Sequence, residues 1–143
     1  MNMTESENTN SSFQGRPTGG GQTIQTLYIT LWKEDEILYV KWADGINITL
    51  DIAKQAVEAR IKFSEGISYP CLIDIRGIKS ASKEAREYLA KEGTQLIKAG
   101  ALLTGSILTR VLANFFLAIN KPPVHTKLFT DEAEAKEWLK QYL

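Results

Sequence analysis

Cysteine and histidine are nearly absent from this chain of 143 residues, which contains one of each, Cys71 and His125. A single cysteine excludes an internal disulfide, and its place in an apolar run predicts a buried thiol. A zinc site needs three or four ligands, so we expect no metal and no cofactor. Ser82, His125 and Asp74 could formally make a hydrolase triad, but the chain has no Gly-x-Ser-x-Gly elbow. We therefore expect a protein that is not an enzyme.

The chain also lacks an excess charge and a long hydrophobic run. Its 17 basic and 17 acidic residues cancel, so nothing in the composition predicts binding to nucleic acid or to an acidic membrane. The longest apolar stretch, 107–119, is interrupted by Thr109, Arg110 and Asn114, and it is too short for a bilayer. The N-terminus has no apolar segment of the signal-peptide kind. We expect a cytoplasmic protein without stable membrane insertion.

We expect the folded domain to begin at about residue 24. Residues 1–23 are rich in Asn, Ser, Thr, Gly and Glu, and such a segment buries too little apolar surface to offset its ordering entropy. We interpret 1–23 as a disordered tail with a glycine linker at 19–21. Residues 24–143 suit a single domain with one core.

Alternating strand and helix patterns predict the fold. A hairpin of strands at 24–32 and 37–42, with Leu27, Ile29 and Leu31 on one face, is followed by alternating units. We expect strands at 70–75, 99–104 and 124–129, and helices at 49–65, 82–98, 106–120 and from Asp131 to the C-terminus. This order predicts an α/β domain with a mixed, mostly parallel sheet, an N-terminal β-hairpin and four helices. In the first helix, Arg60 accompanies an apolar stripe.

Two segments resemble a known family. Residues 72–78 read Leu-Ile-Asp-Ile-Arg-Gly-Ile, and residues 128–139 read Leu-Phe-Thr-Asp-Glu-Ala-Glu-Ala-Lys-Glu-Trp-Leu. With the order of elements, they resemble the STAS domain, and more narrowly the SpoIIAA-like group, which has the anti-sigma-factor antagonist fold and includes Sec14-like relatives. The resemblance covers about 24–143. It implies a regulatory module, or on the Sec14-like side a carrier of small molecules or lipids.

The same resemblance points to two serines. Anti-sigma antagonists carry Asp-Ser-Ser-Gly at the start of the helix after this strand, and a kinase phosphorylates one serine. Residues 80–85 here read Ser-Ala-Ser-Lys-Glu-Ala, so that motif is missing. Ser80 and Ser82 are first of all candidate caps of the following helix. Phosphorylation or partner contact at these two serines is the alternative.

Four polar residues mark a second candidate site. Asp74 lies inside an apolar strand, where it binds either backbone amides and Arg76 or a wider polar cluster with Arg76 and Ser106. Gly105-Ser106 opens a helix with Arg110 one turn later, a pattern that could hold an anion.

The helix at 106–120 has more apolar surface than one sheet can cover. Its candidate partner or ligand residues are Ile107, Leu108, Val111, Leu112, Phe115 and Phe116. They predict a buried helix, a homodimer contact or partner groove, or an apolar-ligand or membrane-surface role. Our leading hypothesis is a non-enzymatic regulatory or protein-interaction module that forms a homodimer, with an unknown protein partner. The alternative is a small-molecule or lipid carrier with an apolar pocket near 106–120.

Overall fold

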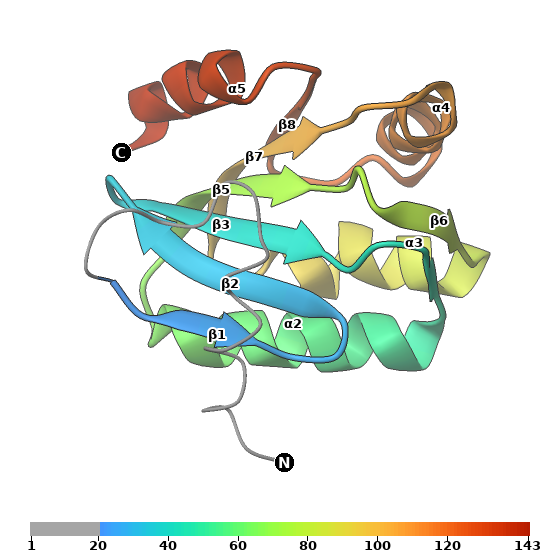
Figure 1. Ribbon diagram of the computed structural model, residues 1–143, viewed down its shortest axis with the longest axis horizontal. Helices are drawn as coiled ribbons and strands as arrows, with labels where there is room; N and C mark the ends of the chain where they lie inside the picture. Colours follow the sequence, from blue (N-terminus) through green and yellow to red (C-terminus); the bar gives the residue numbers. More distant parts are fainter. Residues whose placement is uncertain (1–20) are drawn as a thin grey trace.

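A six-stranded mixed sheet runs through the molecule in the order β1-β2-β3-β5-β7-β8 (Figure 1). The computed structural model describes residues 21–143, so the expected tail at 1–23 lies almost entirely outside the described residues. The first three strands pair antiparallel, and β3, β5, β7 and β8 pair parallel. The strands are β1 (Thr23–Gln25), β2 (Ile29–Glu34), β3 (Ile37–Trp42), β5 (Tyr69–Asp74), β7 (Ile97–Leu103) and β8 (His125–Phe129). The expected mixed, mostly parallel sheet is confirmed.

Helices cover both faces of this sheet. Figure 1 shows α2 and α3 along one face and α5 on the other, while α4 lies beyond the ends of β7 and β8. The four expected helices are present as α2 (Leu50–Ser64), α3 (Lys83–Ala90), α4 (Ile107–Phe115) and α5 (Glu132–Leu139). A short helical segment follows each of the last three helices: η3 (Glu92–Thr94) after α3, the π-helical η4 (Phe116–Asn120) after α4, and η5 (Lys140–Tyr142) after α5.

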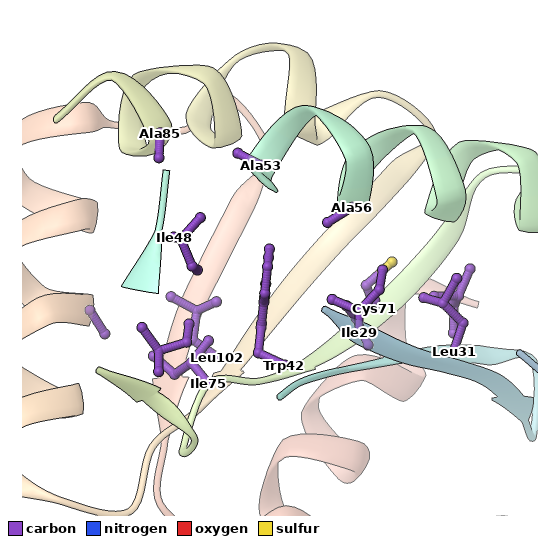
Figure 2. Close-up of a cluster of buried hydrophobic side chains, with 14 residues drawn as sticks. Ile29, Leu31, Trp42, Ile48, Ala53, Ala56, Cys71, Ile75, Ala85 and Leu102 are labelled. Atoms are coloured by element: carbon purple, nitrogen blue, oxygen red, sulfur yellow. The ribbon is translucent and has the colours of Figure 1, made fainter. Parts of the chain in front are cut away.

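The two faces carry separate apolar clusters. On the α2 face, Trp42 extends from β3 toward the inner side of α2, where Ala53 and Ala56 leave room for the indole (Figure 2). On the other face, Ala135 and Leu139 of α5 cover the sheet. The cluster on the α2 face is the larger of the two and also includes residues of α3 and α4.

A second, two-stranded parallel sheet extends the first at one end. It pairs β4 (Ile46–Ile48) with β6 (Ile78–Ala81), neither of which the sequence pattern predicted. The amide of Gly45 donates to the carbonyl of Gly77 at 2.7 Å, and the amide of Ser82 donates to the carbonyl of Ile48 at 3.0 Å. These long-range bonds fix the segments that follow β3 and β5 side by side.

The expected strand at 24–32 is wrong, because it is two strands. The Thr26 side-chain oxygen accepts from the amides of Tyr28 and Ile29, both at 3.1 Å, and folds the chain back on itself. β1 therefore pairs with β2, and Leu27 at the turn is 84% exposed rather than on the face of Ile29. The hairpin of β2 and β3 is confirmed.

The expected helix at 82–98 is also too long. α3 ends at Ala90, η3 follows, and β7 begins already at Ile97. Gly93 is buried here, and Leu96 adopts a left-handed φ of 64°. The chain must turn sharply to enter the sheet, which a continuous helix would prevent.

Gly77 should be essential for the junction of the two sheets. A Cβ at this position would lie 2.8 Å from the carbonyl oxygen of Ala43 and 2.8 Å from the Cα of Asp44, which is closer than side chains pack. We expect Gly77→Ala to lower the free energy of unfolding by about 1–3 kcal/mol in urea titrations. Gly100→Ala is the control, because its Cβ would meet its nearest neighbour at 3.6 Å. Equal stability of the two variants would contradict this account.

Candidate functional site: an apolar cavity with a buried arginine

A cavity of about 130 Å³ lies between the sheet and the helices of its α2 face. Strands β3, β5 and β7 form its floor, and residues of α2, α3, α4 and η4 form its walls. Its lining is almost entirely apolar and includes Trp42, Ile73, Leu102, Leu112 and Phe116. Residues of intermediate exposure, among them Leu112 and Phe116, complete the wall on the side of α4.

Short side chains create this cavity. Its lining contains Ala56 on α2, Gly93 at η3, Gly100 on β7 and Ala113 on α4. Each position would fill part of the space if it carried a leucine or a phenylalanine. Because the elements are held apart by larger residues such as Trp42, the space at the small residues stays empty.

Arg60 of α2 lines the cavity and is only 4% exposed. Its Nη2 donates to the carbonyl of Gly93 at 3.0 Å and to the carbonyl of Gln95 at 2.7 Å. Its Nη1 is buried and has no hydrogen-bond partner. Burial lowers the pKa of the guanidinium, because a charged group is poorly solvated there. An arginine nevertheless keeps its proton in proteins, so Arg60 is a buried cation with one unused donor group.

A second arginine, Arg86 of α3, lines the same cavity nearer to solvent. Its Nη1 donates to the carbonyl of Ala81 at 2.6 Å, and its guanidinium carbon lies 4.9 Å from the ring centre of Phe115. The Nε of Arg86 is buried without a partner. The polar side chains of the wall are these two arginines, each with a buried donor that lacks a partner, and Thr94 and Thr126, whose hydroxyls donate to the carbonyls of Lys91 and Val124.

The polar cluster at the ends of the parallel strands is fully paired. The Asp74 carboxylate accepts two hydrogen bonds from the Arg76 side chain: Nε donates to Oδ1 at 2.9 Å, and Nη2 donates to Oδ2 at 2.7 Å. The Arg76 amide adds a bond of 3.1 Å, and Lys41 lies 3.6 Å from Oδ2. Only about 10 Å³ of space remains beside this cluster, which also borders Glu132. Asp74 thus has a structural role, and the space beside it is too small for a ligand.

Burial alone would raise the pKa of Asp74, but its partners reverse that shift. The side-chain and backbone hydrogen bonds from Arg76, with the charges of Lys41 and Arg76, lower the pKa of this carboxyl below its usual value of 3.8. The sequence did not identify Lys41 as a partner. It lies on β3 directly opposite Asp74 of β5, a register that only sheet pairing reveals.

Ser106 and Arg110 do not join this cluster through any hydrogen bond found among residues 21–143. The Ser106 hydroxyl accepts from the Thr109 amide at 3.1 Å and caps α4. The stem of Arg76 packs beside Gly105, where a Cβ would come within 3.0 Å of it. Arg110 is exposed on α4. The structure therefore brings Asp74 and Arg76 together and leaves Ser106 and Arg110 separate.

The two candidate serines have different positions. Ser82 caps α3 and accepts from the Ala85 amide at 3.1 Å. Ser80 is not a helix cap, because it belongs to β6, where its exposed hydroxyl donates to Asn47 Oδ1 at 2.6 Å. β6 forms by pairing with β4, which the local sequence does not disclose.

The six apolar residues expected on the helix at 106–120 divide into two sets. Leu112 and Phe116 line the cavity. The outward set is exposed by 76% at Ile107, 54% at Leu108, 60% at Val111 and 45% at Phe115, and Ile119 extends it with 61% exposure. We call these five residues the α4 face. One side of the helix thus closes the cavity while the other is an uncovered apolar surface.

The one cysteine and the one histidine of the chain, Cys71 and His125, do not line the cavity. Burial raises the pKa of the Cys71 thiol to about 12, so it stays protonated. His125 makes a hydrogen bond with Tyr142 and contacts the ring of Trp138 on the far side of the sheet. No group of three or more His, Cys, Asp or Glu side chains in the described residues could hold a metal ion. Nor is any helix of this part long and apolar enough to cross a membrane.

The fold defined by this sheet and its helices is SpoIIAA-like. The chain is similar to an uncharacterized protein of the DUF3478 family from Shewanella loihica PV-4, whose crystal structure has a SpoIIAA-like fold. The TM-score is 0.52 and the identity 21%, over 87% of this chain and 99% of that chain. At this identity the likeness concerns the fold alone, and the expected SpoIIAA-like fold is confirmed.

The chain belongs to the family described as domain of unknown function DUF7793, whose model matches residues 31–143. A protein with unknown function from Arthrobacter sp. FB24 is 31% identical, over 82% of this chain and 97% of that chain, with a TM-score of 0.32. No curated protein matches the chain.

Neutralising Asp74 should expose the structural role of its cluster. We expect Asp74→Asn to lower the free energy of unfolding at pH 7 by about 1.5–3 kcal/mol, the usual value of hydrogen bonds to a charged group. Because the folded-state pKa is lowered, this stabilisation is complete above the unfolded-state pKa of about 3.9 and disappears as the pH falls through the folded-state value.

The measurement is urea unfolding of both proteins between neutral and acidic pH. Glu58→Gln, at an exposed position of α2, is the control and should change stability little. A stability difference between Asp74→Asn and the wild type that stays constant down to the lowest pH would contradict the role given to the Asp74 charge.

Proposed function

We propose that this domain binds a small apolar molecule in the cavity and performs no reaction on it. The cavity itself carries the proposal, because an apolar space of this volume is rare inside a close-packed domain. An engineered apolar cavity of roughly 150 Å³ in another protein stays dry and binds benzene. A ligand with an apolar part of about that size fits the space here.

The placement of α4 supports the same function. α4 reaches the cavity through Leu112 and Ala113, and η4 does so through Phe116. α4 follows β7 after a short loop. α4 packs beside β6 and the edge strand β8, and η4 packs on α3. A wall that touches the core along one side can shift to admit a ligand at little cost to the sheet.

The cavity can be tested with 1-hexanol as a neutral apolar probe and hexanoate as a charged one. Binding is followed by amide NMR shifts of the full chain, and we expect shifts at cavity residues such as Ile73, Leu102 and Phe116. Gly100→Val should weaken binding by about tenfold or more, because a single methylene in an apolar pocket is worth that factor. Gly100→Ala should have a smaller effect. Failure of both probes to bind would overturn the proposed function.

A second candidate function is self-association, and it rests on the α4 face. Five large apolar side chains are exposed on one short segment, and monomers rarely leave a large apolar patch uncovered. α4 contains no Asp or Glu, and its one charged residue is Arg110. Two copies of this face could meet with little charge repulsion, which supports a homodimer rather than a charged partner.

Sedimentation velocity at micromolar concentrations tests this candidate. We expect the wild type to sediment as a dimer and Val111→Glu as a monomer, because the new carboxylate would be buried unpaired in the contact. The matched control is Leu27→Glu, which places the same charge at an exposed apolar site in the β1–β2 turn. A monomeric wild type, or equal loss of the dimer in both variants, would exclude this contact.

A further inference from the structure

Arg60 is a buried positive charge that no carboxylate in the described residues balances. The ion pairs of residues 21–143 involve Lys41, Arg76, Lys136 and Lys140 as the cations. Arg60 is in none of them, although it is more deeply buried than any of these four. Buried charges in proteins are normally paired, so an unpaired one needs a separate explanation.

Half of the Arg60 guanidinium has a structural role. Nη2 bonds the carbonyls of Gly93 and Gln95, and it holds the turn between α3 and β7 against α2. This tie uses one nitrogen and leaves Nη1 buried with no acceptor. These two bonds to main-chain carbonyls explain the position of the side chain. They do not explain Nη1, a buried donor without an acceptor on a residue that lines a mostly apolar cavity.

We propose that the cavity takes an amphipathic monocarboxylate, with the carboxylate accepting a hydrogen bond from Arg60 Nη1 and a short apolar chain against the walls. The inference rests on the proposed function and adds the chemical class of the ligand. A carboxylate supplies both features that the site lacks, an acceptor for Nη1 and a negative charge beside the buried cation. Inside a protein, where the effective dielectric constant is lower than in water, such a pair is stronger than in water.

Other ligand classes match the wall less well. A neutral alcohol satisfies the donor and leaves the charge unbalanced, and an amine adds a second cation beside Arg60. A phosphate brings more negative charge and more oxygen atoms than the buried unpaired donors here can meet, since those buried donors are Arg60 Nη1 and Arg86 Nε. Arg86 is also less buried and already contacts the ring of Phe115, so the carboxylate belongs at Arg60.

The test compares three probes of equal chain length on the full chain at neutral pH, by isothermal titration calorimetry. We expect hexanoate to bind about tenfold or more tightly than 1-hexanol, the factor that a charge-assisted hydrogen bond provides, and hexylamine to bind most weakly. The preference should persist at high salt, because a buried pair is screened much less than a surface pair. Equal affinity of hexanoate and 1-hexanol, or a preference that salt removes, would overturn the assignment while leaving the proposed function intact.

Variants locate the carboxylate. Arg60→Gln should bring hexanoate affinity down to that of 1-hexanol, and Arg60→Lys should keep part of the preference because it keeps the charge. Arg86→Gln is the matched control and should keep most of the preference. If Arg86→Gln loses the preference and the Arg60 variants keep it, the carboxylate binds at Arg86 and the proposal is overturned. If Arg60→Gln does not fold, Arg60→Lys and Arg86→Gln still decide between the two positions.

Discussion

The short residues that face the sheet from α2, η3 and α4 are the constraint on which the rest of this structure depends. Ala53 and Ala56 let α2 approach the sheet around Trp42 (Figure 2). The same short side chains leave the neighbouring volume empty. A helix surface of leucines would fill the space and push the helices outward. Close packing in one region and a cavity in the next thus have a single cause, the size of the residues that face the sheet.

Two buried charged groups show how differently a domain can treat a charge. Asp74 meets three bonds from Arg76 and the charge of Lys41, so its burial is compensated within the chain. Arg60 is only half compensated, although it is the more deeply buried. The first group stabilises the junction of strands and loops at the sheet edge. The second has a buried donor without an acceptor in a mostly apolar wall, and this is the observation from which the carboxylate ligand is proposed.

Local patterns predicted the elements well wherever local forces form them. α2 begins at the cap Thr49 and ends where Glu65 and Gly66 turn left-handed, as its sequence indicates. The errors fall where distant contacts decide. The turn at Thr26 splits one expected strand, the ties from Arg60 to Gly93 and Gln95 accompany the early end of α3, and β4 and β6 exist only because they pair with each other. For the site, Asp74 with Arg76 was predictable from their spacing, whereas Lys41 as a partner was not.

The sequence by itself determined the alternation of strands and helices, the burial of Cys71 and the excess of apolar residues on the segment after Ser106. These follow from periodicity and capping, which act over a few residues. Only the tertiary structure decided which apolar residues face a cavity and which face solvent, and that Arg60 is buried with one donor unused. Both depend on how closely α2, α3 and α4 approach the sheet, because a space between elements belongs to no single segment of the chain.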